Sequence, residues 1–145
     1  MTGAARTPEE LLTAVDLFAG MSKRDAKKFL ARAREVTHPK GKRVAGEGDR
    51  GYGFHLILSG RATVSQDSRT IRTLGEGDYF GEISMIDGKP RSATVTVDED
   101  VRALAIGHAD FEKLLDEQPE VARGMLKTLC SRLREAEASA GSAAT

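Results

Sequence analysis

The chain has 145 residues, of which 39% are hydrophobic and 30% charged, and its 22 basic residues equal its 22 acidic ones. These values are typical of a single globular domain with one hydrophobic core, and the zero net charge excludes a broad positive field for holding nucleic acid or an anionic membrane. The single cysteine cannot form an internal disulfide, and no segment has the apolar length of a membrane helix or the pattern of a signal peptide. We therefore expect a cytoplasmic protein.

Two helices are predicted at the N-terminus. Thr7 can cap the first helix, Pro8 suits its first position, and Glu10 completes a capping box. Ser22 begins the second helix, whose apolar residues recur at helical spacing. A short apolar elbow over residues 17–21 joins the two helices.

Short strands separated by glycines are predicted in the middle of the chain. The predicted strands are Phe54–Leu58, Arg61–Ser65, Thr70–Leu74, Ala93–Val97 and Val101–Ile106. The segment around Gly60 is predicted to be a tight hairpin in which this glycine takes a positive φ. Many short strands with turn residues between them favour an antiparallel sandwich or barrel.

Helical spacing returns near the C-terminus. A short helix is predicted from His108, and Pro119 is predicted to start a last helix. Its apolar stripe consists of Val121, Met125, Leu126, Leu129, Cys130 and Leu133. The stripe either covers the strands or pairs with a second copy of the chain, and Cys130 is interpreted as a small core residue. The small, polar residues 138–145 predict a disordered tail.

The segment from Gly77 to Val95 carries the most informative chemistry. Gly81 allows the backbone to approach a ligand closely, and a short helix near Glu82 would direct free N–H groups at an anion. An ionised Glu82 only accepts hydrogen bonds, which suits a hydroxyl such as a ribose 2′-OH. Arg91 supplies paired donors for phosphate, and Ser92 adds a hydroxyl and an N–H. Together these groups match a sugar phosphate.

This segment also carries a family resemblance. It contains Phe80-Gly81-Glu82-Ile83-Ser84 followed by Pro90-Arg91-Ser92-Ala93. In this order the residues resemble the phosphate-binding cassette of the cyclic-nucleotide-binding domain family, which includes bacterial catabolite activators, the regulatory subunit of protein kinase A and gated ion channels. The glycine turns Ala45-Gly46-Glu47-Gly48-Asp49 and Gly75-Glu76-Gly77-Asp78 resemble those of the same family.

The resemblance implies an α+β, mainly β fold. Its centre would be an antiparallel double-stranded β-roll of the jelly-roll type, flanked by N-terminal helices and a long C-terminal helix. We expect one domain over residues 1–145, structured from about residue 10 to residue 137.

The resemblance also implies a role for each residue of the cassette. Arg91 would hold the phosphate, Glu82 would accept from the ribose 2′-OH, and Gly81 would let the sugar sit close. The backbone N–H groups of Ile83, Ser84 and Ser92 would complete the anion site.

The last helix is implied to act as a lid over the base. Bacterial activators place a Thr-Ser pair on this helix, and counting from Arg132 assigns those positions to Ala136 and Glu137. Glu137 can accept from the adenine amino group or from guanine N–H groups, so either cAMP or cGMP remains a candidate ligand. The competing interpretation of Glu137 is a solvated helix residue.

The predicted function is a cyclic-nucleotide receptor, for cAMP or alternatively cGMP, that moves its C-terminal helix and signals to a partner protein. A homodimer through that helix is a further expectation, whereas a metal, an enzymatic activity, a membrane and a nucleic acid are not expected. Two alternatives remain. One is an interaction module that keeps the fold without binding a nucleotide, and the other is the sensor portion of a transcription regulator without its DNA-binding domain.

Overall fold

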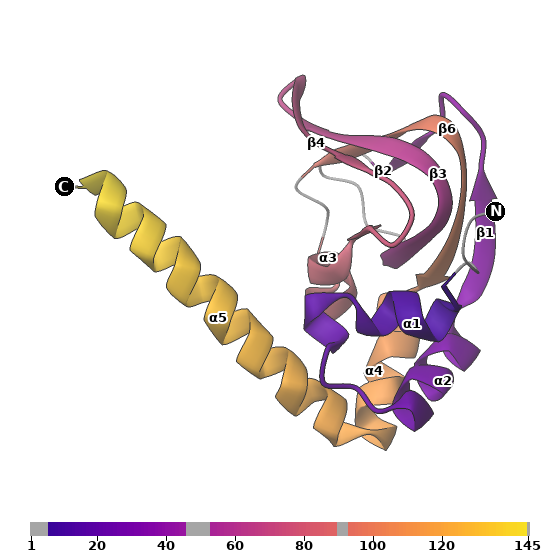
Figure 1. The fold of residues 1–145 in the computed structure, drawn as a ribbon, viewed down its shortest axis with the longest axis vertical. Coiled ribbons are helices and arrows are strands. Elements are labelled where there is room, and N and C mark those ends of the chain that lie inside the picture. Colours follow the sequence, from indigo (N-terminus) through magenta and orange to yellow (C-terminus); the bar gives the residue numbers. More distant parts are fainter. Residues whose placement is uncertain (1–5, 46–52, 90–92, 145) are drawn as a thin grey trace.

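The fold is taken from a computed structural model, which describes residues 6–45, 53–89 and 93–144. Its centre is a sheet of six strands, with the helices gathered at one end of the sheet (Figure 1). The strands are β1 Arg34–His38, β2 Arg43–Ala45, β3 Phe54–Gln66, β4 Arg69–Leu74, β5 Tyr79–Phe80 and β6 Thr94–Ile106. The helices are α1 Pro8–Thr13, the 3₁₀ turn η1 Asp16–Phe18, α2 Lys23–Arg32, α3 Glu82–Asp87, α4 His108–Glu117 and α5 Pro119–Ala144.

All strand pairs are antiparallel. The order across the sheet is β1-β6-β3-β4, while β2 also pairs with β6 and β5 with β3. The long strands β3 and β6 curve strongly, so the sheet rolls up on itself (Figure 1). This architecture confirms the predicted β-roll with helices at both ends of the chain.

The predicted starts of the N-terminal helices are confirmed. The Thr7 hydroxyl accepts from the Glu10 N–H at 3.1 Å, and the Glu10 carboxylate accepts from the Thr7 N–H at 3.1 Å. The Ser22 hydroxyl likewise accepts from the Asp25 N–H at 3.1 Å. Such caps satisfy backbone donors that helices leave open and contribute about 1 kcal/mol each.

The hairpin predicted at Gly60 is wrong. β3 runs through this residue as a single strand, and the pairing with β6 shifts register on either side of it. Gly60 does have a positive φ of 95°, and a Cβ there would lie 2.1 Å from the carbonyl oxygen of Asp100. The glycine therefore permits a close approach of two strands at an irregularity, and the chain reverses instead at Asp67 and Ser68.

The prediction of two separate strands after residue 92 is also wrong, because the structure joins them into the single strand β6. The polar residues Asp98, Glu99 and Asp100 between them are exposed but remain in extended conformation. The pairing of Glu99 with Arg61 of β3 helps to hold this segment, an effect that local sequence does not report.

Two hydrophobic clusters build the core. In the first, the rings of Phe18, Phe29 and Phe54 lie 4.9 to 6.1 Å apart and join the N-terminal helices to the sheet. The second lies inside the roll and includes Ile57 and Phe80. Because Phe54 and Phe80 belong to neighbouring strands, the two clusters fix the position of the segment that follows β5.

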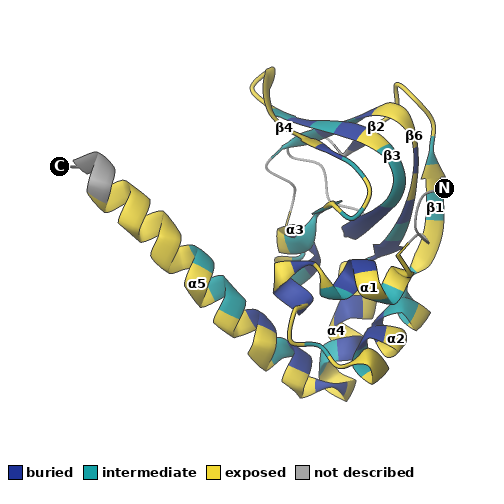
Figure 2. Cartoon of the chain, in the orientation of Figure 1, coloured by how far each residue is buried: buried dark blue, intermediate teal, exposed yellow. Residues whose placement is uncertain are grey.

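Helix α5 leaves the body of the protein after its first turns. Val121 and Met125 are buried, whereas Leu126 is 62% and Leu133 is 58% exposed, and the second half of α5 projects away from the roll (Figure 2). Cys130 is exposed, so its interpretation as a core residue is wrong. The structure continues α5 as a helix through Ala144, where composition predicted a disordered tail. Among the described residues, none of the helices combines the length and apolar character needed to cross a bilayer.

Candidate functional site

A sharp turn at Gly81 creates the candidate site. Strand β5 ends at Phe80, and Gly81 adopts a left-handed conformation with φ 84°, from which α3 starts at once. The Gly81 carbonyl accepts the first bond of the helix, from the Met85 N–H at 3.0 Å. The N–H groups in the first turn of a helix have no partner within it, so the backbone at Ile83 presents donors beside the turn.

A cavity of about 460 Å³, its open mouth included, lies between this turn and the inner wall of the roll. The described residues that line it are Val64, Arg72, Phe80, Gly81, Glu82, Ile83, Ser84, Ala93 and Val95. The structure therefore brings together four of the predicted site residues, those at positions 81–84. Polar groups of α3 face an apolar wall from three strands, which is the usual make-up of a small-molecule site.

Glu82 is the unusual group of this cavity. Its side chain is only 14% exposed, and within the described part of the chain it forms one ion pair, in which Arg132 Nη1 lies 4.0 Å from Glu82 Oε1. Among the described residues, no hydrogen-bond partner is present for its buried Oε2. A buried acceptor without a partner is costly to a fold. The carboxylate is therefore poised to accept a hydrogen bond from a ligand.

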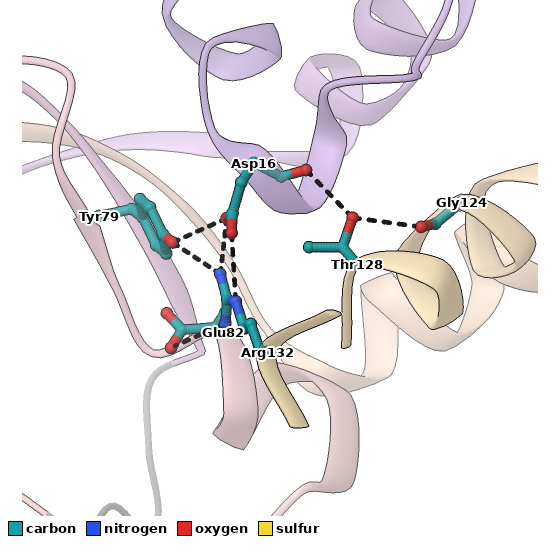
Figure 3. A network of polar contacts seen from close by, with 6 residues as sticks. All are labelled: Asp16, Tyr79, Glu82, Gly124, Thr128 and Arg132. Atoms are coloured by element: carbon teal, nitrogen blue, oxygen red, sulfur yellow. Dashed lines mark hydrogen bonds and ion pairs between the residues drawn. The ribbon is translucent and has the colours of Figure 1, made fainter. Parts of the chain in front are cut away.

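Three residues behind Glu82 form a network that the sequence did not predict (Figure 3). Arg132 of α5 donates to both carboxylate oxygens of Asp16, at 2.6 and 3.2 Å, and to the Tyr79 hydroxyl at 2.7 Å. The Tyr79 hydroxyl donates to Asp16 at 3.0 Å. These residues belong to η1, β5 and α5, so no local sequence pattern could have linked them.

The network fixes the charge of its members. The hydrogen bonds that Arg132 donates lower the pKa of Asp16 below its ordinary value, and the same bonds to the Asp16 carboxylate raise the pKa of Arg132. Burial raises the pKa of Tyr79 to about 12. At neutral pH the network therefore contains a carboxylate, a guanidinium and an uncharged phenol.

Arg72 is a further cavity residue that the sequence analysis missed. In the sheet register it lies opposite Val64, which in turn lies opposite Val95. The three residues form one row across β4, β3 and β6, and all three line the cavity. The side chain of Arg72 has no hydrogen-bond or salt-bridge partner among residues 6–45, 53–89 and 93–144. A periodicity-based interpretation of an exposed strand could not assign it to a cavity.

The other predicted site residues are Arg91, Ser92 and Glu137. Arg91 and Ser92 lie outside the described residues, although the next residue, Ala93, lines the cavity. Glu137 is exposed on the projecting half of α5 and is not among the lining residues. In the described part of the chain, no cluster of three or more His, Cys, Asp or Glu side chains is arranged to hold a metal ion.

Comparisons with known proteins agree with this geometry. The sequence model of the cyclic nucleotide-binding domain matches residues 35–118. The chain is 33% identical to the cyclic AMP receptor protein of Thermus thermophilus over 126 residues, which are 83% of this chain and 58% of that protein. It is 35% identical to a cAMP-dependent protein kinase regulatory subunit of Debaryomyces hansenii over 109 residues, 74% of this chain and 24% of that one. The chain thus spans less than two thirds of these relatives.

Solved structures show the same fold. The N-terminal domain of a transcriptional regulator from Streptomyces coelicolor aligns with a TM-score of 0.80 at 30% identity and covers 87% of this chain and 94% of that one. The catabolite activator protein of Thermus thermophilus aligns with a TM-score of 0.77 at 30% identity and covers 89% of this chain and 63% of that one.

Proposed function

Because the chain belongs to the cyclic nucleotide-binding domain family, we propose that it is a regulatory receptor for a cyclic nucleotide and has no catalytic role. The observation that carries the proposal is the Glu82 carboxylate beside a glycine turn, which is 14% exposed and whose buried Oε2 is unpartnered among the described residues. A ribose 2′-hydroxyl is the donor that this acceptor lacks.

The cavity suggests how the ligand is oriented. With the ribose at Glu82, the cyclic phosphate would lie toward the N–H groups of Ile83 and Ser84, and Arg91 and Ser92 are proposed to bind it as well. These two residues lie four and five positions after the last residue of α3, and a guanidinium suits the phosphate because it donates paired hydrogen bonds. Glu137, on the projecting half of α5, would reach the base only after α5 moves.

Arg72 gives a reason to favour cGMP over cAMP. The apolar row of Val64 and Val95 offers a surface for the base, and Arg72 ends that row. Guanine presents two acceptors, O6 and N7, which a guanidinium binds in pairs, whereas adenine presents an amino donor beside N7. An arginine has no acceptor for that amino group.

We expect the Arg72→Ala variant to lose this discrimination. Each paired contact between arginine and guanine contributes about 1–3 kcal/mol of selectivity, so the ratio of the two affinities should fall by about 5- to 100-fold. Calorimetric titration of wild type and R72A with both nucleotides measures the ratio. An unchanged ratio would remove Arg72 from base recognition.

The output is proposed to be the position of α5. Its exposed leucines, Leu126 and Leu133, suit contact with a partner protein or with α5 of a second copy in a homodimer, and the cytoplasm is the proposed location. Signalling requires that the ligand bind the two positions of α5 with different affinity.

A thermal-shift titration with cAMP and cGMP tests the proposed function. Ligand at a hundredfold excess over Kd adds about 2.7 kcal/mol to the free energy of unfolding, and for a chain of this size Tm should rise by about 5–10 °C. AMP and GMP, which lack the cyclic phosphate, serve as controls. A Tm that neither cyclic nucleotide changes would favour a module that uses the fold only for protein interaction.

A further inference from the structure

Arg132 lies between two carboxylates that compete for it. Its Nε and Nη2 donate to Asp16 at 3.2 and 2.6 Å, whereas its Nη1 is 4.0 Å from Glu82 (Figure 3). In this structure Asp16 therefore holds the guanidinium, and Glu82 has only a long ion pair. Both carboxylates and the guanidinium sum to one negative charge, immediately behind a cavity proposed to bind an anion.

Asp16 is also the anchor for the middle of α5. The Thr128 hydroxyl donates to the Asp16 carbonyl at 3.3 Å and to Gly124 of its own helix at 3.4 Å. Among the described residues, the hydrogen bonds from α5 beyond Gly124 to the rest of the protein all go to Asp16 and Tyr79. The next two residues of η1, Leu17 and Phe18, are buried in the core, so Asp16 is held firmly in place.

We propose that Asp16 is a positioning residue that withholds Arg132 from the ligand site and thereby holds α5 in its ligand-free position. The proposal rests on the proposed function and names its regulation. A cyclic nucleotide brings one more negative charge to the cavity beside Glu82, so the guanidinium is drawn from Asp16 toward the cavity. The Tyr79 hydroxyl touches both partners and can keep contact with Arg132 as it moves.

The consequence is that occupancy of the cavity and the position of α5 are coupled through one side chain. When Arg132 leaves Asp16, α5 loses its charged anchor and is free to move toward the ligand. Part of the binding free energy of the ligand is used to break the contact between Arg132 and Asp16. The competition therefore lowers the apparent affinity for the cyclic nucleotide.

The Asp16→Asn variant tests this proposal because it keeps the shape of the side chain and removes its charge. We expect its affinity for cAMP and cGMP to rise about 3- to 10-fold, since the competing anion is gone. A residue with a merely structural role would lower the affinity when replaced. The matched control is Glu35→Gln, whose carboxylate is about as exposed as that of Asp16 and pairs with Arg102 between β1 and β6; this variant should leave the affinity unchanged.

A distance measurement in the absence of ligand separates this proposal from the proposed function. Spin labels at S139C on α5 and R69C on β4, in a C130S background, report the position of α5 relative to the roll. Without ligand, we expect the D16N variant to show a different distance distribution from the wild type. Adding ligand should then change the distribution of D16N less than it changes that of the wild type.

Two results overturn the proposal: a D16N affinity equal to or below that of the wild type, or an unchanged ligand-free distance distribution. If the wild type binds neither nucleotide, the proposed function fails, and the ligand-free distances alone still decide whether Asp16 holds α5.

The Y79F variant, which keeps both charges, is expected to retain the wild-type distance distribution without ligand. A D16N-like distribution in Y79F would show that the hydroxyl, and not the Asp16 charge, holds α5.

Discussion

Replacing Arg91 with alanine is expected to weaken binding of cAMP and cGMP by about 10- to 1,000-fold. The arginine is proposed to make two charge-assisted hydrogen bonds to the cyclic phosphate, and such bonds contribute about 1.5–3 kcal/mol each. When the side chain is removed, water takes over part of the hydrogen bonding to the phosphate. The expected loss of binding free energy is therefore about 1.4–4 kcal/mol. Calorimetric titration of R91A with both nucleotides measures it.

Arg69→Ala is the matched control for this variant. Arg69 is exposed on β4 and does not line the cavity, so its removal should leave both affinities within about twofold. R91A should also retain the Tm of the ligand-free protein. An R91A affinity equal to that of the wild type would refute the phosphate role of Arg91, which lies outside the described residues and is assigned from its motif.

The second large effect is expected at Glu82, measured with a 2′-deoxy ligand. Wild-type protein should bind 2′-deoxy-cAMP about 10- to 100-fold more weakly than cAMP, because the carboxylate loses a hydrogen bond of about 1.5–3 kcal/mol. The Glu82→Gln variant should bind both ligands with nearly equal affinity, since a neutral amide is a weaker acceptor. If E82Q discriminates between them as the wild type does, Glu82 does not contact the 2′-hydroxyl.

The ligand-free stability of E82Q provides an independent check. Under the proposed function, the Glu82 carboxylate, which is 14% exposed and has one unpartnered oxygen among the described residues, serves ligand binding at the expense of the fold. We therefore expect E82Q to unfold at the wild-type temperature or above it. A clear fall in Tm would instead identify Glu82 as a structural ion-pair partner of Arg132.

Local patterns in the sequence determined where the N-terminal helices start and the chemistry of the cassette. The caps at Thr7 and Ser22 were predictable because capping depends on residues within three positions of each other. Gly81 and Glu82 were identified by their residue types, Ile83 and Ser84 by the family resemblance, and the structure places all four around one cavity. The same patterns could not show that Glu82 would be buried without a full set of partners.

The tertiary structure decided what depends on distant neighbours. The hairpin expected at Gly60 is wrong because β6 lies against that glycine and holds β3 as one strand, and pairing across the sheet overrides local turn preference. Cys130 is exposed because α5 leaves the core after Met125, whereas helical periodicity alone shows only that a stripe exists.

The contacts around the cavity likewise depend on tertiary packing and not on local sequence patterns. Arg72 joins it through strand register, and Asp16, Tyr79 and Arg132 meet although more than 50 residues separate each from the next. A sequence states which groups can ionise or donate, and local rules place them on helices and strands. Which of them share one guanidinium is set by how η1, β5 and α5 pack, because electrostatic contact depends on distance in space and not on distance along the chain.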